Sequence, residues 1–316
     1  MELNKSKNIE RVRQLSLLII LLLEIVLFTL LSDRFFRFSN AISILRQVSV
    51  TGISAMGMFM IILLGDIDLS VGAMYAFIGV VSALIFRATE SAALAIVAAL
   101  GMGTLIGLVN GVITAKFKIP AFITTLAMMS VCSGFAYIIT KGTPIGVTDP
   151  SFTLLGSGYI AGVIPLPIIF MLIVLALGWF MMYKTRFGRH IYACGGNAQA
   201  AKWSGINADR IKIIVFTIAG FLNGFAAIVL AGRLGGGLPS AGDGSEMDVI
   251  TAVVLGGTSM SGGRGKLWGV VLGVLIIGVL TVGLTMIGVS TYWQKVIKGV
   301  IIVVAVIIDT KGSKSA

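Results

Sequence analysis

Two aspartates, Asp66 and Asp68, stand one residue apart in "LLGDIDLSVG" (63–72), inside a stretch whose other side chains suit lipid. A carboxylate at the centre of a bilayer costs roughly 2.5–3.5 kcal/mol on insertion scales, so such residues usually face a protein interior or a cavity. Here the available chemistry is hydrogen bonding. Asp68 can accept hydrogen bonds from Ser70 or from backbone N–H groups at the start of a helix that we expect to begin near Leu69.

A second polar passage begins with Glu246 and Asp248, which head a short apolar segment, and continues into "VLGGTSMSGG" (254–263). Its glycines interrupt a regular helix, and the hydroxyls of Thr258 and Ser259 can bond the freed backbone groups. This motif and "LLGDIDLSVG" share Leu-Gly followed by Ser-x-Gly at the same spacing. A second pair, "GLVNG" (107–111) and "GFLNG" (220–224), shares its two glycines and its asparagine. Such echoes are compatible with an internal repeat.

The elements that position these residues are predicted to be membrane helices. The chain is 57% hydrophobic and 12% charged with a mean hydropathy of +1.03, whereas soluble domains are about 25% charged. A span needs about 20 apolar residues, and two of the apolar segments, 48–64 and 248–260, are short enough to suggest broken or re-entrant helices. We therefore predict an all-α polytopic bundle in one domain, 1–316, with about ten spans near 14–32, 48–64, 70–86, 91–115, 119–140, 163–183, 211–232, 248–260, 267–288 and 292–308.

The distribution of Lys and Arg predicts the orientation of these spans. With ten crossings and a cytoplasmic N-terminus, 16 basic residues fall on the cytoplasmic side and 6 on the other, as the positive-inside rule expects. The cytoplasmic parts are then a tail at 1–13, a loop at 184–210 and a tail at 310–316. This topology and anionic lipid headgroups explain the net charge of +11 without nucleic-acid binding.

The loop at 184–210 has more local structure than a linker needs. Asn197 is placed to cap a short helix over "AQAAKWS" (198–204), and Gly205 is placed to end it in a left-handed turn. Two interpretations stay open: an ordinary interfacial loop, or a helix that docks into a groove on a cytoplasmic partner.

Other chemistry finds little support in the sequence. Two cysteines, Cys132 and Cys194, and one histidine, His190, lack partners at the spacing of a metal site or a nucleophilic triad. No phosphate-loop motif occurs, because "GGRGK" (262–266) is followed by Leu267. We expect no catalytic residue, metal or cofactor in this chain, so the energy for any active process comes from another chain or an ion gradient.

The motifs together resemble the membrane subunits of monosaccharide (ribose-type) ABC importers, over roughly residues 30 to 310. They are "GDIDLSVG" (65–72), "PAFITTLAMM" (120–129), "TRFGRHIYACGGNAQAAKWSGI" (185–206) and "EMDVITAVVLGGTSMSGGRG" (246–265). The resemblance implies a multi-pass protein of the bacterial inner membrane. It also implies three partners: a sugar-binding protein outside, ATPase subunits that use ATP and Mg inside, and a second permease copy or a similar subunit.

The resemblance assigns candidate roles to residues. Asp66 stands where many relatives carry glycine, which bears on the choice of sugar. The loop residues that match the family's ATPase contact are Gly188, Arg189, Asn197, Ala200, Ala201 and Gly205. The neighbouring Arg186 is added to them as a candidate coupling residue. The candidate residues of the sugar path are Asp66, Asp68, Ser70, Glu246, Asp248, Thr258 and Ser259.

Alternatives remain for both the residues and the protein. Asp68 caps a helix, contacts sugar or relays protons, while Glu246 and Asp248 either line the path or cap their helix. An ABC permease for another small polar solute is the main alternative function. An ion-coupled secondary transporter would also use broken helices and buried carboxylates, and an intramembrane enzyme is disfavoured by the missing metal ligands.

Overall fold

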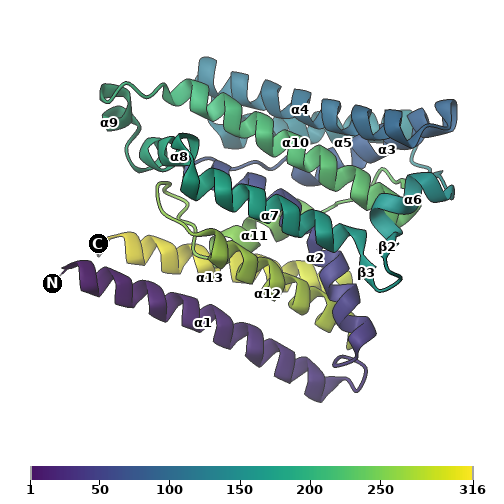
Figure 1. Ribbon diagram of the computed structural model, residues 1–316, viewed down its shortest axis with the longest axis horizontal. Coiled ribbons are helices and arrows are strands. Elements are labelled where there is room, and N and C mark those ends of the chain that lie inside the picture. The colour runs from purple at the N-terminus through teal and green to yellow at the C-terminus, as the bar shows by residue number, and fades with distance from the viewer. Residues whose placement is uncertain (1, 315–316) are drawn as a thin grey trace.

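The computed structural model describes residues 2–314, with side chains described for residues 15–307. In this part of the chain, long helices lie side by side along one direction (Figure 1). The long helices are α1 (Glu2–Leu31), α2 (Phe38–Leu63), α3 (Val71–Thr89), α4 (Ala92–Lys116), α5 (Ala121–Thr140), α7 (Leu166–Lys184), α10 (Ala208–Leu234), α12 (Leu267–Met286) and α13 (Thr291–Lys314). The shorter ones are α6 (Pro150–Ser157), α8 (Arg186–Gly196), α9 (Ala198–Trp203) and α11 (Ser245–Leu255).

The all-helical membrane class is confirmed, and among the described residues seven helices are long and apolar enough to cross a bilayer by length and composition: α2, α3, α4, α5, α7, α10 and α12. The described apolar part of α1 is shorter, Leu15–Leu31, and α13 carries Lys295 and Lys298 within its apolar sequence. The number of crossings therefore stays a prediction. The side chains of the basic residues predicted for the two tails, 1–13 and 310–316, lie outside the described ones.

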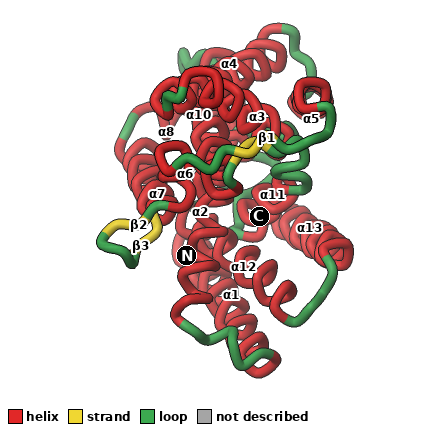
Figure 2. The backbone as a smooth tube through the Cα atoms, turned by 90° about the vertical axis from the view of Figure 1, so that its right-hand side faces the viewer, coloured by secondary structure: helices red, strands yellow, loops and turns green. Residues whose placement is uncertain are grey.

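The prediction that the segment 48–64 is short was wrong. α2 begins at Phe38 and continues for 26 residues, because Phe38 to Gln47 add almost three turns that their polar residues had hidden from a hydropathy reading. Of the residues in its most apolar stretch, 78% are buried, against 22% in that of α5. α2 accordingly runs through the centre of the bundle (Figure 2), and its buried run from Val48 onward is apolar on most sides, as expected for a central helix.

The start of α1 and the end of α13 lie at the same end of the bundle as α8 and α9 (Figure 1). The opposite end carries α6 and two short antiparallel strand pairs, β1 (Ile145–Gly146) with β4 (Gly236–Gly237) and β2 (Tyr159–Ile160) with β3 (Ile164–Pro165). Asp149 caps α6 there: its carboxylate accepts hydrogen bonds from the hydroxyl and backbone N–H of Ser151, which lower the pKa of that exposed carboxyl.

The most extensive helix–helix contact joins α4 to α10. The two lie antiparallel with glycines facing one another, so that a Cβ on Gly107 would lie 2.2 Å from the Phe216 carbonyl oxygen and 2.8 Å from the Gly220 Cα. Small residues allow this backbone approach between membrane helices. The echo between "GLVNG" and "GFLNG" therefore coincides with a packing contact, which is reason enough for both to be rich in glycine.

The short segment predicted at 248–260 is a short helix followed by a glycine-rich turn. After α10, residues 235–244 turn back along α3, with Gly237 against Val80 and Gly242 against Tyr75. α11 then starts beside the first turn of α3. Its 11 residues cover about 16 Å, roughly half of the hydrocarbon thickness, which agrees with the predicted broken or re-entrant helix.

Candidate functional site

The loop between α2 and α3 carries the paired aspartates. It leaves α2 through Gly65, whose φ of +78° favours glycine, and α3 begins at Val71, two residues later than we predicted. The Asp68 Oδ1 atom accepts hydrogen bonds from the backbone N–H of Ser70 at 2.8 Å and from its hydroxyl at 2.6 Å. The carboxylate thus turns the chain into the helix from two residues before the cap position, which is Ser70.

Asp68 lies in a buried polar cluster. Its side chain is 2% exposed. The Asn110 amide of α4 donates to the Ser70 hydroxyl at 3.3 Å, and the backbone N–H of Leu69 donates to the Thr125 hydroxyl of α5 at 3.1 Å. Two helices, α4 and α5, therefore fix this loop. The sequence signal for Asn110 was its position in "GLVNG", a polar side chain within an apolar span.

Asp66 has a different environment, although it is only two residues away. Its carboxylate forms an ion pair with Lys212 near the start of α10 at 2.7 Å, and both side chains are largely buried. Lys212 follows α9 closely in the sequence. The ion pair therefore connects the α2–α3 loop to α10, the helix that follows the predicted partner-contact loop at 184–210.

Glu246 and Asp248 meet the far end of this loop. The Glu246 carboxylate lies so close to Gly72 that a Cβ there would be 2.3 Å from its Oε2 atom. Asp248 pairs with Lys298 of α13 at 2.7 Å. Nearby, the Tyr75 hydroxyl donates to the Ser54 hydroxyl at 2.6 Å, which joins α3 to α2 at the same level.

Thr258 and Ser259 lie at the other end of α11. Thr258 is fully buried next to Gly265, and its hydroxyl has no hydrogen-bond partner within the described residues. The backbone N–H of Ser259 donates to the Arg264 carbonyl at 2.8 Å and closes the turn. The predicted path residues thus form two levels, separated by the length of α11, about 16 Å. Glu246 and Asp248 lie at one level, and Asp66, Thr258 and Ser259 at the other. Asp68 and Ser70 lie on the loop between the two levels.

The loop at 184–210 folds into two helices. In α9, the Asn197 side chain accepts a hydrogen bond from the Ala200 N–H at 2.9 Å, and Gly205 follows with a φ of +81°. The predicted cap and left-handed turn are confirmed. α8 was missed, because its glycines mask a helical pattern; the Thr185 hydroxyl accepts from the Gly188 N–H and starts it.

α8 packs directly on the two polar loops. A Cβ on Gly195 would lie 1.7 Å from the Leu63 carbonyl oxygen at the end of α2. The same oxygen accepts a hydrogen bond from Gly263 N–H at 2.8 Å, so one atom joins α2 to the turn after α11. The shared contact places "LLGDIDLSVG" and "VLGGTSMSGG" side by side at this end of the bundle.

Two tyrosines reinforce the junction. The Tyr192 hydroxyl of α8 donates to the Gly265 carbonyl at 2.9 Å, and the Leu267 N–H donates to the Tyr183 hydroxyl of α7 at 3.0 Å. Burial, and then the neighbouring Tyr183, raise the pKa of Tyr192, which therefore stays a donor. Sequence analysis missed both tyrosines, since nothing in their spacing indicates that they meet.

The outer surface of α8 and α9 is free for a partner. Arg186, Arg189, Asn197 and Ala200 are exposed, and so is Trp203, whose side chain is 81% exposed. Gly188 and Ala201 face inward, where Gly188 contacts the end of α7. Cys194 is also buried, and burial raises the pKa of its thiol. The residues predicted as a partner contact therefore divide into an outward basic group and an inward packing group.

Comparison with known proteins agrees with this architecture. Residues 40–306 match the family described as branched-chain amino acid transport system / permease component. The chain belongs to this family of transport permeases. It is 45% identical to the ribose import permease protein RbsC of Escherichia coli K12 over 298 residues, which cover 93% of this chain and 92% of that protein.

Two further relatives name ribose again and xylose. The permease is 41% identical to the ribose import permease protein RbsC of Bacillus subtilis, covering 92% of this chain and 90% of that protein. It is 34% identical to the xylose transport system permease protein XylH of Haemophilus influenzae, covering 87% and 90%. No solved structure matches it. The matched region includes every predicted path and coupling residue.

Proposed function

We propose that this permease forms the translocation path of an ABC importer for a monosaccharide. An extracytoplasmic binding protein delivers the sugar, and separate ATPase subunits, which use ATP and Mg, drive the permease. The chain pairs with a second copy or a similar subunit in the bacterial inner membrane. Support comes from the identity with ribose and xylose permeases over most of the chain.

The observation that carries the mechanism is the junction at Leu63. Its carbonyl oxygen touches α8 on one side and bonds the turn after α11 on the other, and the loop with Asp66 and Asp68 begins two residues later. A displacement of α8 and α9 by a docked ATPase would move both polar loops together. A partner shifts such an equilibrium only if it binds one arrangement better than the other, and the exposed basic surface of α8 and α9 is where we place that difference.

In this proposal α8 and α9 lie in the cytoplasm, and the bundle crosses the membrane ten times, counting α1, α11 and α13. Asp66, Asp68 and Ser70, with Thr258 and Ser259, border the inner part of the path. Glu246 and Asp248 border its middle. Carboxylates and hydroxyls recognise a polyol by hydrogen bonds.

The family description names branched-chain amino acids, so a different small solute is the second candidate. An amino acid carries a fixed ammonium and carboxylate, which require charged partners once they leave water. In the described interior, Asp66 and Asp248 already pair with lysines. Two of the four path carboxylates are therefore already neutralised, which leaves fewer charged partners for such a solute.

The test is uptake into vesicles in which the permease has a known orientation and is reconstituted with its ATPase and its binding protein. Radiolabelled ribose, xylose, arabinose and leucine are compared with and without ATP, alongside a variant with a scrambled 197–205 segment. We expect ATP-dependent uptake of one sugar, lost in the variant although the permease keeps its melting temperature. Uptake that ignores ATP and follows a proton or sodium gradient would contradict the proposal, and leucine uptake would replace the substrate class.

A further inference from the structure

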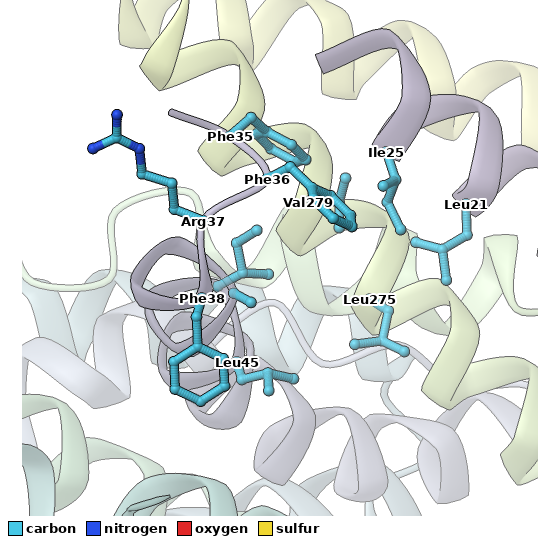
Figure 3. A pocket seen from close by; sticks show the side chains of 11 residues that line it. Leu21, Ile25, Phe35, Phe36, Arg37, Phe38, Leu45, Leu275 and Val279 are labelled. Carbon is cyan, nitrogen blue, oxygen red and sulfur yellow. The ribbon is translucent and has the colours of Figure 1, made fainter. Parts of the chain in front are cut away.

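A cavity of about 580 Å³ lies between α1, α2 and α12, towards the end of the bundle opposite α8 (Figure 3). Its volume is within the range of small-molecule sites. It is separate from the polar loops described above, which surround the start of α3. The lining residues are Leu21, Ile25, Phe35, Phe36, Arg37, Phe38, Ala41, Ile44, Leu45, Leu275 and Val279.

The walls exclude a sugar as the occupant. Every lining residue except Arg37 is apolar, and a polyol placed there would lose hydrogen bonds to water without replacement. The walls suit a hydrocarbon chain. Since α1, α2 and α12 form part of a membrane bundle, lipid acyl chains are the hydrocarbon that surrounds them.

One end of the cavity is charged. The Arg37 guanidinium points away from the apolar side chains (Figure 3), is exposed, and forms no ion pair with any described carboxylate. It belongs to the loop that follows α1, whereas Leu21 lies ten residues before the end of that helix, about 15 Å deeper. The loop also carries Arg34 against a single acid, Asp33, so its net charge is positive.

We propose that this cavity binds an anionic phospholipid, with one acyl chain between α1 and α2 and the phosphate on Arg37. A guanidinium forms paired hydrogen bonds with phosphate oxygens. Net positive charge at the loop favours a headgroup with net negative charge. The acyl chain also fills the space beside α1, which packs Phe28 on Gly283 of α12.

The test uses a tryptophan reporter at the mouth of the cavity. Full-length permease with Phe36→Trp is reconstituted with either phosphatidylglycerol or phosphatidylcholine brominated on an acyl chain, and the signal of the four native tryptophans is subtracted by parallel measurement of the parent protein. We expect brominated phosphatidylglycerol to quench the reporter at lower mole fraction than brominated phosphatidylcholine. Arg37→Gln should weaken this preference roughly fivefold, which corresponds to the ~1 kcal/mol that one basic side chain contributes beside an anionic lipid.

Two controls separate a site from general lipid contact. Arg87→Gln removes an exposed cation at the same end of the bundle but far from the cavity, and should leave the preference unchanged. A reporter at Val26→Trp, a position that is 55% exposed and does not line the cavity, should be quenched equally by both lipids. Equal quenching of the Phe36→Trp reporter by both lipids, or its quenching by neither, would overturn the proposal.

Discussion

At the scale of single residues, Gly195 is where α8 meets the end of α2. An added methyl group would overlap the Leu63 carbonyl oxygen, at 1.7 Å, so α8 must move away or tilt. Gly196 follows it in the same helix, and a Cβ there meets nothing within 4 Å. The pair distinguishes contact at the junction from helix propensity, since both substitutions replace glycine by alanine within α8.

We predict that Gly195→Ala lowers ATP-dependent uptake at least tenfold, with a cost in packing of about 1–3 kcal/mol. Its ATP hydrolysis should continue, because the outward surface of α8 and α9 is unchanged. Gly196→Ala should transport at the parent rate. The measurement is sugar uptake per ATP hydrolysed in reconstituted vesicles. If the two variants behave alike, the junction at Leu63 does not transmit the motion.

At the scale of elements, α11 is held to α13 by the ion pair between Asp248 and Lys298. Both side chains are largely buried. Removal of one partner leaves a buried charge uncompensated, which typically costs 3–5 kcal/mol, whereas removal of both charges costs much less. We predict that Lys298→Met lowers the melting temperature of the purified protein strongly and that Asp248→Asn with Lys298→Met restores most of it. A double variant no more stable than the single one would show that the pair does not hold these helices together.

The α4–α10 contact makes a second prediction about elements. Gly107→Ala should destabilise the protein by about 1–3 kcal/mol, because its methyl group would overlap the Phe216 carbonyl oxygen. Gly101 of the same helix has nothing within 4 Å of an added Cβ, so Gly101→Ala should be neutral or slightly stabilising. Thermal melting in detergent compares the two. Equal melting temperatures would mean that the helices separate at little cost.

Elements were predicted well from the sequence where hydropathy decides and poorly where contact decides. The long apolar runs located the spans because lipid imposes length and composition. The start of α2 was missed, since Arg46 and Gln47 lower its local hydropathy while the helix itself continues. α8 was missed because Gly188 and Gly195, which look like helix breakers, are required for close approach to α7 and α2.

For the candidate site, the sequence supplied the polar residues but not their partners. Asp68 with Ser70 was predictable because they are two residues apart. Asp66 with Lys212, Asp248 with Lys298 and Tyr192 with Gly265 join segments 50 or more residues apart, and no local pattern encodes such pairs. The division of the path residues into two levels likewise follows from the length of α11, which only its observed end at Leu255 defines.

At the scale of the whole molecule, the open question is whether α1 and α13 cross the membrane. α13 spans 24 residues, about 36 Å of helix, and lies along the other long helices (Figure 1). Its lysines lower its mean hydropathy and so argue against a membrane span. Lys298, however, is neutralised by Asp248, which reduces the free-energy cost of burying that charge. We therefore predict that α1 and α13 both cross the membrane, so that the N-terminus, the C-terminus and α9 all lie in the cytoplasm.

Single cysteines in a background without Cys132 and Cys194 test this topology in intact cells with a membrane-impermeant maleimide. Ser39→Cys at the start of α2, Ser290→Cys before α13 and Ser157→Cys on α6 lie at the end of the bundle opposite α8, and they should react from outside as positive controls. Ser204→Cys after α9 should react only after the membrane is opened. These four side chains are exposed, so burial does not account for a negative result. Ser6→Cys in α1 and Ser313→Cys in α13 report on the two helices in question and should also react only after the membrane is opened. If either of them reacts from outside in intact cells, its helix does not cross, and the count of ten spans is wrong.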